Sequence, residues 1–526
     1  MNFALCQVPF PVESCLSGVA PNSSKAIVKN MWYRLTFDAK GAAGHSTLLH
    51  FGAVDWQSTI FLNGQQVGNN TGGYNGFDFD ISKHVKSAGN ELIVYVFDPS
   101  DSGKQPNGKQ RISAIDNPGG DTYTPSSGIW QTVWLEEVPA AYITAVTIDQ
   151  ASVSAVGVTV TTAGGATATT DTGAAVTFEV MLAGKSVATA TGTVGAKTSI
   201  SIPAPKLWST TSPTLYDLKI TAGADTVIAY FGLRTFELGD GPKGKRPLLN
   251  GKFTFAAGFL DQSWWPDGQY TAPTDAGLAY DVEAVPMFGL NMIRLHQKVN
   301  PERWYYHADK LGVLIFQDMV QKYGGANNDT IPFFVADFKA MVAGRGNHPS
   351  IVQFETFNEG DCWGVFKTKP FDVASIVALS KQLAPDRLVD TDSGGGANNL
   401  HIGDVNDIHS YPSPGDPQPS KSQYAMIGEF GGIGAFVEGK EWKPKACHTY
   451  LHTDTPAEEA STYIKMAATI QSRVDHVSAS VYTQTTDLEL ECDGFREWRP
   501  PLSCTEIAAG HTRNPVYGLP ALLARI

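Results

Sequence analysis

Hydrophobic and polar residues alternate with a period of two along much of residues 1–139. The segments that share this alternation are rich in β-branched or aromatic residues: 31–39, 46–54, 58–68, 76–82, 90–99 and 128–138. Such alternation places successive side chains on opposite faces of a strand. Asn63-Gly64 lies within one of these segments and is typical of a two-residue hairpin turn. Residues 1–139 are therefore predicted to form an all-β sandwich.

The pattern changes over residues 140–238. Short strand-like segments rich in Val, Thr and Ala follow one another at regular spacing. This spacing within roughly 100 residues is typical of an immunoglobulin-like β-sandwich. Few residues in this region are of the types that carry out chemistry, so we expect it to be a spacer.

From residue 239 to residue 526 apolar strands alternate with helical patterns, which indicates βα units and a parallel sheet. The predicted strands are 252–261, 291–297, 313–319, 351–359, 387–394, 407–412, 424–432 and 480–487. Helical periodicity fits between most of them, at 275–289, 301–312, 334–346, 372–384 and 458–474. The sixth unit has a Pro-rich loop, PSPGDPQPSKS, in place of a clear helix. Eight strands of this kind predict a (β/α)8 TIM barrel.

Nearly every predicted barrel strand ends in polar residues. They are Asp261, Arg294 with His296, Asp318, Asn358 with Glu359, Asp392, His409 with Tyr411, Glu429, and Asp487. Contact with water explains a polar residue at any single strand end about equally well. Active sites of such barrels lie where the C-terminal strand ends converge. Eight polar strand ends together therefore favour a polar cleft at that face.

Two glutamates stand out among these residues. Glu359 is predicted to end the fourth strand and Glu429 the seventh, and 429 − 359 = 70 residues separate them. Two carboxylates ~5–5.5 Å apart hydrolyse a glycosidic bond with retention of configuration, because one attacks the anomeric carbon and the other transfers protons. Strands on opposite sides of a barrel can bring two such groups across its mouth. The pair therefore makes glycoside hydrolysis a candidate function.

The same segments resemble glycoside hydrolase family two, which includes β-galactosidases, β-glucuronidases and β-mannosidases. NHPSIVQFETFNEG (347–360) resembles the acid/base segment of that family, and IGEFGG (427–432) resembles its nucleophile segment. Three further segments are similar to the first-strand loop, the second strand and the eighth strand: 260–277, 291–298 and 480–489. FGAVDWQSTIFLNGQQVGNNTGGYNGFDFDIS resembles the family's N-terminal sugar-binding jelly roll, and residues 140–238 resemble its immunoglobulin-like domain.

The resemblance implies a role for each residue of the predicted cleft. Glu359 would be the general acid/base, with a raised pKa that keeps it protonated before the first step. Glu429 would be the nucleophile, kept ionised by hydrogen bonds from Arg294 and Tyr411. Asn358 would hold the 2-hydroxyl of the sugar.

Other residues are expected around the sugar. Three residues would line the subsite: His296, His409 and Asp261. Trp265 or its neighbour Trp264 would form a stacking wall, although packing in the core is nearly as good an explanation. Glu355 lies on the same side of an ideal strand as Glu359. It is interpreted as a partner of Arg294 in the barrel interior, or as a residue that supports the site from behind the residues that contact the sugar. Asp361, Cys362 and Trp363 are expected at the rim, where sugar specificity is set.

Composition excludes several other function classes. The net charge of −13 disfavours a nucleic-acid partner, since phosphate binding needs a basic surface. No apolar run approaches the ~20 residues of a membrane span. The six Cys residues show neither a CxxC pair nor metal-type spacing, so buried thiols and one or two disulfides both stay open. We expect no metal, no cofactor and a carbohydrate substrate.

The alternatives left open concern specificity and activity. A retaining exo-β-glycosidase, β-galactosidase-like in the broad sense, is the leading interpretation, with β-glucuronidase or β-mannosidase specificity as alternatives. A catalytically inactive carbohydrate-binding protein and an endo-acting barrel glycanase are further alternatives. Both ends depart from the family pattern, because the first jelly-roll strands are missing and residues 496–526 differ. The compartment is open: secreted if a signal preceded this chain, and otherwise cytoplasmic. The oligomeric state is also open.

Overall fold

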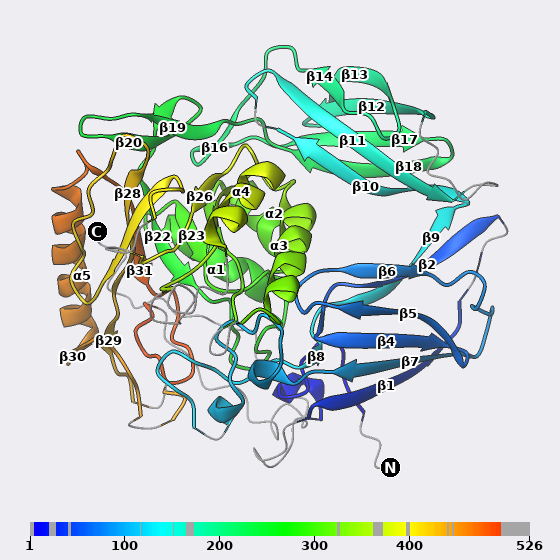
Figure 1. Cartoon of the computed structure of the whole chain (residues 1–526), viewed down its shortest axis with the longest axis horizontal. Coiled ribbons are helices and arrows are strands. Elements are labelled where there is room, and N and C mark those ends of the chain that lie inside the picture. The colour runs from blue at the N-terminus through cyan, green and yellow to red at the C-terminus, as the bar shows by residue number, and fades with distance from the viewer. Residues whose placement is uncertain are drawn as a thin grey trace.

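The structure is a computed structural model. The described residues are 5–19, 28–39, 41, 44–115, 117–150, 152–164, 173–322, 327–360, 372–395, 400–438, 441–443 and 446–495. The predictions for Asp361, Cys362, Trp363 and the segment 496–526 lie outside these residues. In Figure 1 the first sandwich runs from blue to cyan, the second from cyan to green, and the barrel from green to orange.

The first region is an all-β sandwich, as predicted. One sheet has the order β1-β7-β4-β5 and the other has the order β6-β2-β9, while β3 pairs with β8. The strands are β1 (Asn30–Phe37), β2 (His45–Phe51), β3 (Val54–Asp55), β4 (Gln57–Leu62), β5 (Gln65–Thr71), β6 (Phe77–Asp80), β7 (Asn90–Phe97), β8 (Gly128–Ile129) and β9 (Val133–Pro139). In β7 alternate residues are buried, which is the period-two pattern seen in the sequence.

The predicted hairpin at Asn63-Gly64 is confirmed. Leu62 of β4 pairs with Gln65 of β5, so these two residues form the turn. Their φ angles are 52° and 79°, both in the left-handed region that a type I′ turn requires. Asn and Gly adopt this conformation at lower cost than other residues, which explains why they stand here.

The second region also consists of antiparallel sheets. One has the order β10-β11-β14 and the other the order β13-β12-β17-β18. The strands are β10 (Ala141–Asp149), β11 (Ala155–Gly164), β12 (Ala175–Leu182), β13 (Lys185–Thr193), β14 (Thr198–Ser201), β15 (Trp208–Ser209), β16 (Ser212–Pro213), β17 (Tyr216–Ala222) and β18 (Asp225–Phe231). Val, Ile and Leu side chains from the two sheets pack together as a separate core. The boundaries at 139/140 and 238/239 stay predictions.

The third region contains a nearly closed barrel of parallel strands in the order β26-β25-β24-β23-β22-β31-β28-β27. They are β22 (Ala256–Asp261), β23 (Met292–Leu295), β24 (Leu314–Asp318), β25 (Ile351–Glu355), β26 (Leu388–Asp390), β27 (Val405–Ser410), β28 (Tyr424–Gly431) and β31 (Val477–Thr483). Among the described residues, strand pairing joins all neighbours except β26 and β27. The barrel prediction is confirmed.

Helices follow most of the barrel strands. They are α1 (Asp275–Met287), α2 (Glu302–Leu311), α3 (Ile331–Arg345), α4 (Val373–Leu383) and α5 (Pro456–Gln471). Short strands β19 (Phe236–Asp240), β20 (Lys245–Leu249) and β21 (Lys252–Phe253) form a separate sheet before the barrel, and β29 (Ile433–Ala435) pairs with β30 (Leu451–Thr453). None of these described helices has the length and apolar character needed to cross a membrane.

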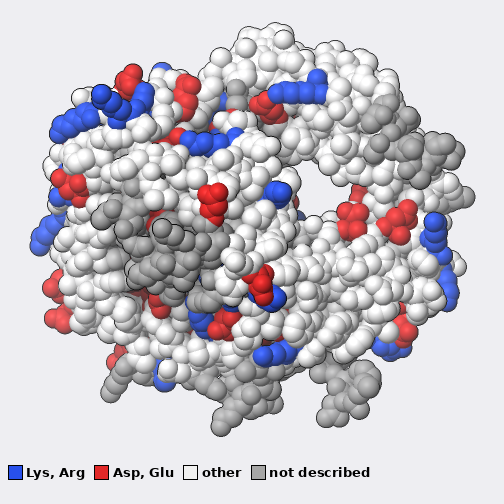
Figure 2. Space-filling view, viewed as in Figure 1, with Lys and Arg blue, Asp and Glu red and all other residues white. Residues whose placement is uncertain are grey.

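Charged side chains are dispersed over the face of the molecule that Figure 2 draws. Figure 2 shows Lys and Arg interspersed with Asp and Glu on one face, without a continuous basic surface. A nucleic-acid partner would need such a surface. The face drawn in Figure 2 does not present such a surface.

Two strand ends differ from the prediction. β25 ends at Glu355, so Glu359 lies four residues beyond the strand instead of closing it. β28 continues to Gly431, so Glu429 lies inside its strand instead of at the end. The loop after β25 therefore carries one glutamate of the candidate pair, and the wall of the barrel carries the other.

Candidate active site

Main-chain geometry explains how Glu359 leaves the strand. Its φ angle is 48°, in the left-handed region, which turns the chain sharply after Asn358. The Glu359 N–H donates to the Ser393 carbonyl oxygen at 2.8 Å, and Asn358 forms a parallel bridge with Ser393. The side chain of Glu359 stays 32% exposed, so it is accessible from the barrel mouth.

Arg294 of β23 is the central cation of the site and is fully buried. Its Nη1 donates to Glu429 Oε1 at 2.8 Å, and its Nη2 donates to Asn358 Oδ1 at 2.7 Å. Its Nε donates to Glu355 Oε2 at 2.5 Å, which agrees with the interpretation of Glu355 as an interior partner. Asp318 at the end of β24 accepts from both Nε and Nη2. Nearby carboxylates outweigh burial and raise the pKa of Arg294, so it stays charged.

Glu429 is held as a carboxylate. Burial alone would raise its pKa, but the charges of His409 and Arg294 lower it below the ordinary value. The Tyr411 hydroxyl donates to its second oxygen at 2.5 Å and lies 2.7 Å from Thr483 Oγ1. A buried, ionised and firmly oriented carboxylate is suited to act as a nucleophile.

Glu359 does not have the raised pKa that the sequence led us to expect. Burial acts in that direction, but the hydrogen bond and the charge of His409 lower the pKa of Glu359 to about 2. His409 Nδ1 lies 2.8 Å from Glu359 Oε1 and 3.4 Å from Glu429 Oε2. Burial would lower the pKa of His409, yet Glu429 and Glu359 raise it to about 9. Near neutral pH the proton therefore rests on His409.

The two glutamates are close together. One oxygen of Glu359, one ring nitrogen of His409 and one oxygen of Glu429 all lie within 4.8 Å of one another. Within the described part of the chain, this is the group whose geometry could hold a metal ion. A cation is disfavoured there because His409 carries a proton and its Nε2 lies 2.9 Å from Ser393 Oγ.

The structure brings some of the other predicted residues to the site. Asn358 lies beside Arg294, and the Nδ1 of His296 lies within hydrogen-bond distance of Asp318 Oδ2. His296 is 1% exposed, and burial lowers its pKa well below 6.5, so it is neutral. A neutral imidazole can serve as a hydrogen-bonding group toward a sugar hydroxyl.

Asp261 and Trp265 have other surroundings than expected. Asp261 is buried and accepts hydrogen bonds from the N–H and hydroxyl of Ser263, so it shapes the loop after β22. Trp265 is 4% exposed, and its Nε1 donates to the Gly277 carbonyl at 3.3 Å. The buried ammonium of Lys298 lies 4.6 Å from the Trp265 ring centroid. This placement favours the core role of Trp265 over a stacking wall.

The first sandwich also reaches the barrel mouth, which the sequence did not reveal. Tyr123 bonds through its hydroxyl to Glu491, and Gln262 Nε2 donates to the same hydroxyl at 2.7 Å. Lys109 Nζ lies 5.9 Å from the Tyr123 ring centroid, and its charge lowers the pKa of Glu359. No signal in the sequence links these distant segments, because only the fold makes them neighbours.

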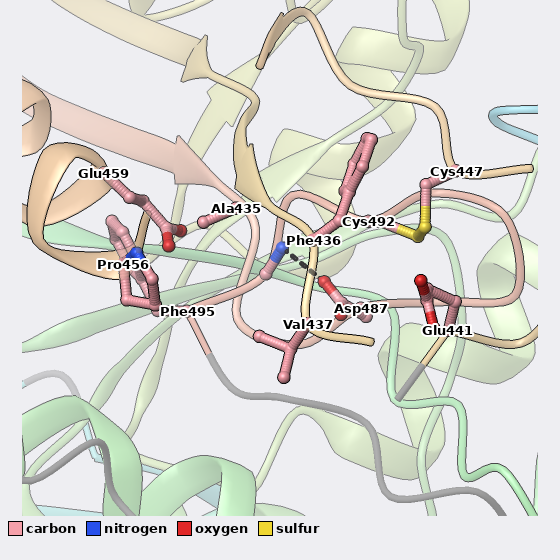
Figure 3. Close-up of a pocket in the computed structure, with 11 residues that line it drawn as sticks. Ala435, Phe436, Val437, Glu441, Cys447, Pro456, Glu459, Asp487, Cys492 and Phe495 are labelled. Carbon is pink, nitrogen blue, oxygen red and sulfur yellow. Dashed lines mark hydrogen bonds between the residues drawn. A yellow bond between two sulfur atoms is a disulfide. The ribbon is translucent and has the colours of Figure 1, made fainter. Parts of the chain in front are cut away.

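A small pocket lies beside the loops of this site. Figure 3 shows the disulfide between Cys447 and Cys492 at its edge, with Phe436 and Asp487 among the residues that line it. The cavity volume is about 40 Å³, whereas ligand pockets measure roughly 300–1,000 Å³. The pocket is therefore too small for a sugar ring.

The cysteine question left open by the sequence is partly resolved. Cys447 and Cys492 form a disulfide, and Cys15 is also disulfide-bonded. Cys6 is a free thiol.

Family models match the first two regions of the chain. The model described as "Glycosyl hydrolases family 2, sugar binding domain" matches residues 7–139. The model described as "Glycosyl hydrolases family 2" matches residues 131–234.

Curated relatives extend the similarity into the barrel. The chain is 27% identical over 327 residues to a Formosa agariphila protein with a provisional β-glucuronidase name. It is 26% identical over 343 residues to a Thermoanaerobacter pseudethanolicus β-galactosidase. These matches cover 59% and 61% of this chain but only 37% and 43% of the relatives, so the chain spans about two fifths of their length.

Solved structures of similar fold cover most of the chain. A β-glucuronidase from Bifidobacterium dentium has a TM-score of 0.74 at 18% identity, with 98% of this chain and 93% of that chain covered. A β-glucuronidase from Lactobacillus rhamnosus has a TM-score of 0.73 at 21% identity, with 93% and 88% covered. At these identities the similarity establishes the arrangement of two sandwiches and a barrel.

Proposed function

Because the chain belongs to glycosyl hydrolase family 2, we propose that it is a retaining exo-β-glycosidase of β-galactosidase-like specificity. The observation that carries the proposal is the pair Glu359 and Glu429 at the barrel mouth, with oxygens of both within 4.8 Å. Single displacement needs a wider gap, since a water molecule must fit between the carboxylate and the sugar. The close pair therefore supports double displacement.

In the first step Glu429 attacks the anomeric carbon and the bond to the leaving oxygen breaks. Arg294 and Tyr411 donate hydrogen bonds to the two carboxylate oxygens of Glu429, which orients it for attack. The leaving oxygen needs a proton, and Glu359 is the group placed to deliver it. Transfer from His409 Nδ1 across the 2.8 Å contact would supply that proton to Glu359.

In the second step water displaces Glu429 from the sugar. Glu359, now a carboxylate, accepts a proton from the attacking water, and the proton can return to His409. Asn358 lies where its amide can meet a sugar hydroxyl beside the nucleophile, because Arg294 holds its Oδ1 at 2.7 Å. Each group ends the cycle in the protonation state in which it began.

Two alternatives to β-galactosidase-like activity rest on different observations. The relatives and fold neighbours named above include β-galactosidases and β-glucuronidases, so β-glucuronidase activity is the second candidate. A catalytically inactive carbohydrate-binding protein is a third. The hydrogen bonds that orient Glu429 favour catalysis over binding alone, since they hold a carboxylate ready for attack.

The decisive experiment is a panel of aryl β-glycosides: galactoside, glucuronide, mannoside and glucoside. Cleavage of one of them, with the β-anomer as first product in NMR spectra, would support retention. Glu429→Gln should lower kcat by at least ~10⁴-fold. Glu283→Gln, on the exposed face of α1, is the matched control and should keep full activity. Hydrolysis of none of the four substrates would favour the inactive binding protein.

A further inference from the structure

The side-chain amide of Gln321 holds the main chain of Asn358 at two points. Its Nε2 donates to the Asn358 carbonyl oxygen at 3.0 Å, and its Oε1 accepts from the Asn358 N–H at 3.2 Å. Gln321 is 1% exposed, so water does not compete for these bonds. Together the two bonds fix the peptide groups on both sides of Asn358, as a neighbouring strand would.

Glu359 needs such support because of its backbone conformation. A φ angle of 48° is costly for a residue with a side chain, and it persists only where the surroundings enforce it. On the other side, Ser393 accepts from the Glu359 N–H at 2.8 Å and donates its own N–H to the Phe357 carbonyl at 2.9 Å. The turn that aims Glu359 is therefore clamped between Gln321 and Ser393.

Gln321 is itself held by a loop of the first sandwich. The N–H groups of Asn107 and Gly108 donate to the Gln321 carbonyl oxygen at 3.3 and 3.1 Å. Gly108 has a φ angle of 52°, and a Cβ atom there would lie 3.0 Å from the Gln297 carbonyl oxygen. Only glycine allows the loop to approach so closely in this conformation. The Gln321 N–H also donates to Gln297 Oε1 at 3.2 Å.

We propose that Gln321 is a positioning residue for proton transfer: it fixes the Asn358–Glu359 main chain so that Glu359 meets the leaving-group oxygen. The turn at Asn107–Gly108 holds Gln321 in that position. Through this contact the first sandwich takes part in catalysis. The inference rests on the proposed glycosidase function, because it concerns the acid step of that reaction.

The dependence on the leaving group distinguishes positioning from general stability. A phenolate that is a poor leaving group needs protonation, whereas 2,4-dinitrophenolate departs without it. Gln321→Met should therefore lower kcat/KM about 30-fold or more for the phenyl glycoside of the preferred sugar and less than about 3-fold for the dinitrophenyl glycoside. Nucleophilic attack by Glu429 stays intact in this variant.

Gln150→Met is the matched control. Gln150 is equally buried, and its amide also makes two main-chain bonds, to the Asn347 carbonyl at 2.8 Å and from the Gly232 N–H at 3.0 Å. The bond to Asn347 joins the second region to the barrel, and the bond from Gly232 lies within the second region, so neither involves the Asn358–Glu359 main chain. Gln150→Met should lower the unfolding temperature as Gln321→Met does and change kcat/KM equally for both leaving groups.

Gln321→Glu is the second variant, in case Gln321→Met does not fold. It keeps the acceptor for the Asn358 N–H and loses the donor to the Asn358 carbonyl. Its loss of kcat/KM for the phenyl glycoside, relative to the dinitrophenyl glycoside, should therefore lie between those of the wild type and Gln321→Met. An equal loss on both substrates in either folded variant, or no loss, would overturn the inference. That result leaves the proposed function standing, whereas wild-type protein inactive on every aryl β-glycoside contradicts the proposed function itself.

Discussion

Nδ1 of His409 lies 2.8 Å from a carboxylate oxygen of Glu359. The pKa of His409 is raised to about 9 and that of Glu359 is lowered to about 2, so the proton rests on the ring in the free protein. An acid step at this site therefore depends on both residues. Sequence alone assigns that step to Glu359.

The first prediction concerns the pH dependence of activity. His409 loses its proton as the pH rises through about 9, so kcat/KM should fall there. In His409→Asn the proton must sit on Glu359 alone, whose pKa lies far below 9. The basic limb of kcat/KM should then move down by at least about 2 pH units. Initial rates between pH 4 and 10.5 measure this shift.

His45→Asn serves as the control, because His45 is exposed at the start of β2 in the first sandwich. It should keep the wild-type profile. A basic limb that stays near pH 9 in His409→Asn would show that the proton for the acid step comes from another group.

The fold could be predicted from the sequence because the hydrophobic pattern is local. Period-two alternation and apolar βα units located most strands, and the turn residues Asn63-Gly64 located a hairpin. Glu355 and Glu359 show where this reasoning fails. The predicted strand 351–359 runs through both residues, yet the strand ends at Glu355. Gln321 and Ser393 bind the main chain beyond it, and no local pattern reveals such distant partners.

The candidate site shows the same limit. Arg294 and Glu429 could be paired in advance because both lie on barrel strands whose C-terminal ends converge. The lowered pKa of Glu359 could not be predicted from the sequence. It depends on His409, which is 50 residues away and meets Glu359 only in the fold. Trp265 lies in the core because the Gly277 carbonyl and Lys298 surround it, and composition cannot show which aromatic residues are exposed.

Arg294→Met should change both stability and the acid limb of the activity profile. It leaves Asp318 and Glu429 buried without their cation, which typically costs about 3–5 kcal/mol of unfolding free energy. It also raises the pKa of Glu429, so activity should be lost at higher pH on acidification than in the wild type. Urea unfolding and pH–rate profiles measure the two effects. An unchanged acid limb would contradict the role of Arg294 in keeping Glu429 ionised.

Replacing Cys447 and Cys492 by alanine should destabilise the protein and loosen the loop beside the nucleophile. The disulfide closes a segment with a sequence separation of 45, for which chain entropy predicts roughly 4 kcal/mol. Tyr450 in this segment stacks on Tyr411 with ring centroids 3.8 Å apart, and Tyr411 binds Glu429. Urea unfolding should show a lower midpoint, and kcat should fall modestly. An unchanged midpoint would contradict a stabilising role for this bridge.

His348 should make stability depend on pH at the junction of the second sandwich and the barrel. Its Nδ1 lies 2.6 Å from Asp309 Oδ2, which also accepts from the Tyr230 hydroxyl of β18, and its Nε2 lies 2.7 Å from Glu302. Burial would lower the pKa of His348, but these carboxylates raise it to about 9. A pKa raised on folding stabilises the native state below the unfolded value, here 6.5, and this contribution is lost as the pH rises through about 9.

His348→Asn should therefore cost roughly 3 kcal/mol more at pH 6 than at pH 10, since each pKa unit is worth about 1.4 kcal/mol. Urea unfolding of wild type and variant at both pH values measures this difference. His452→Asn is the control, because its side chain is half exposed and faces Asp454 at 3.8 Å. An equal cost of His348→Asn at the two pH values would mean that packing of the ring, and not its charge, ties the sandwich to the barrel.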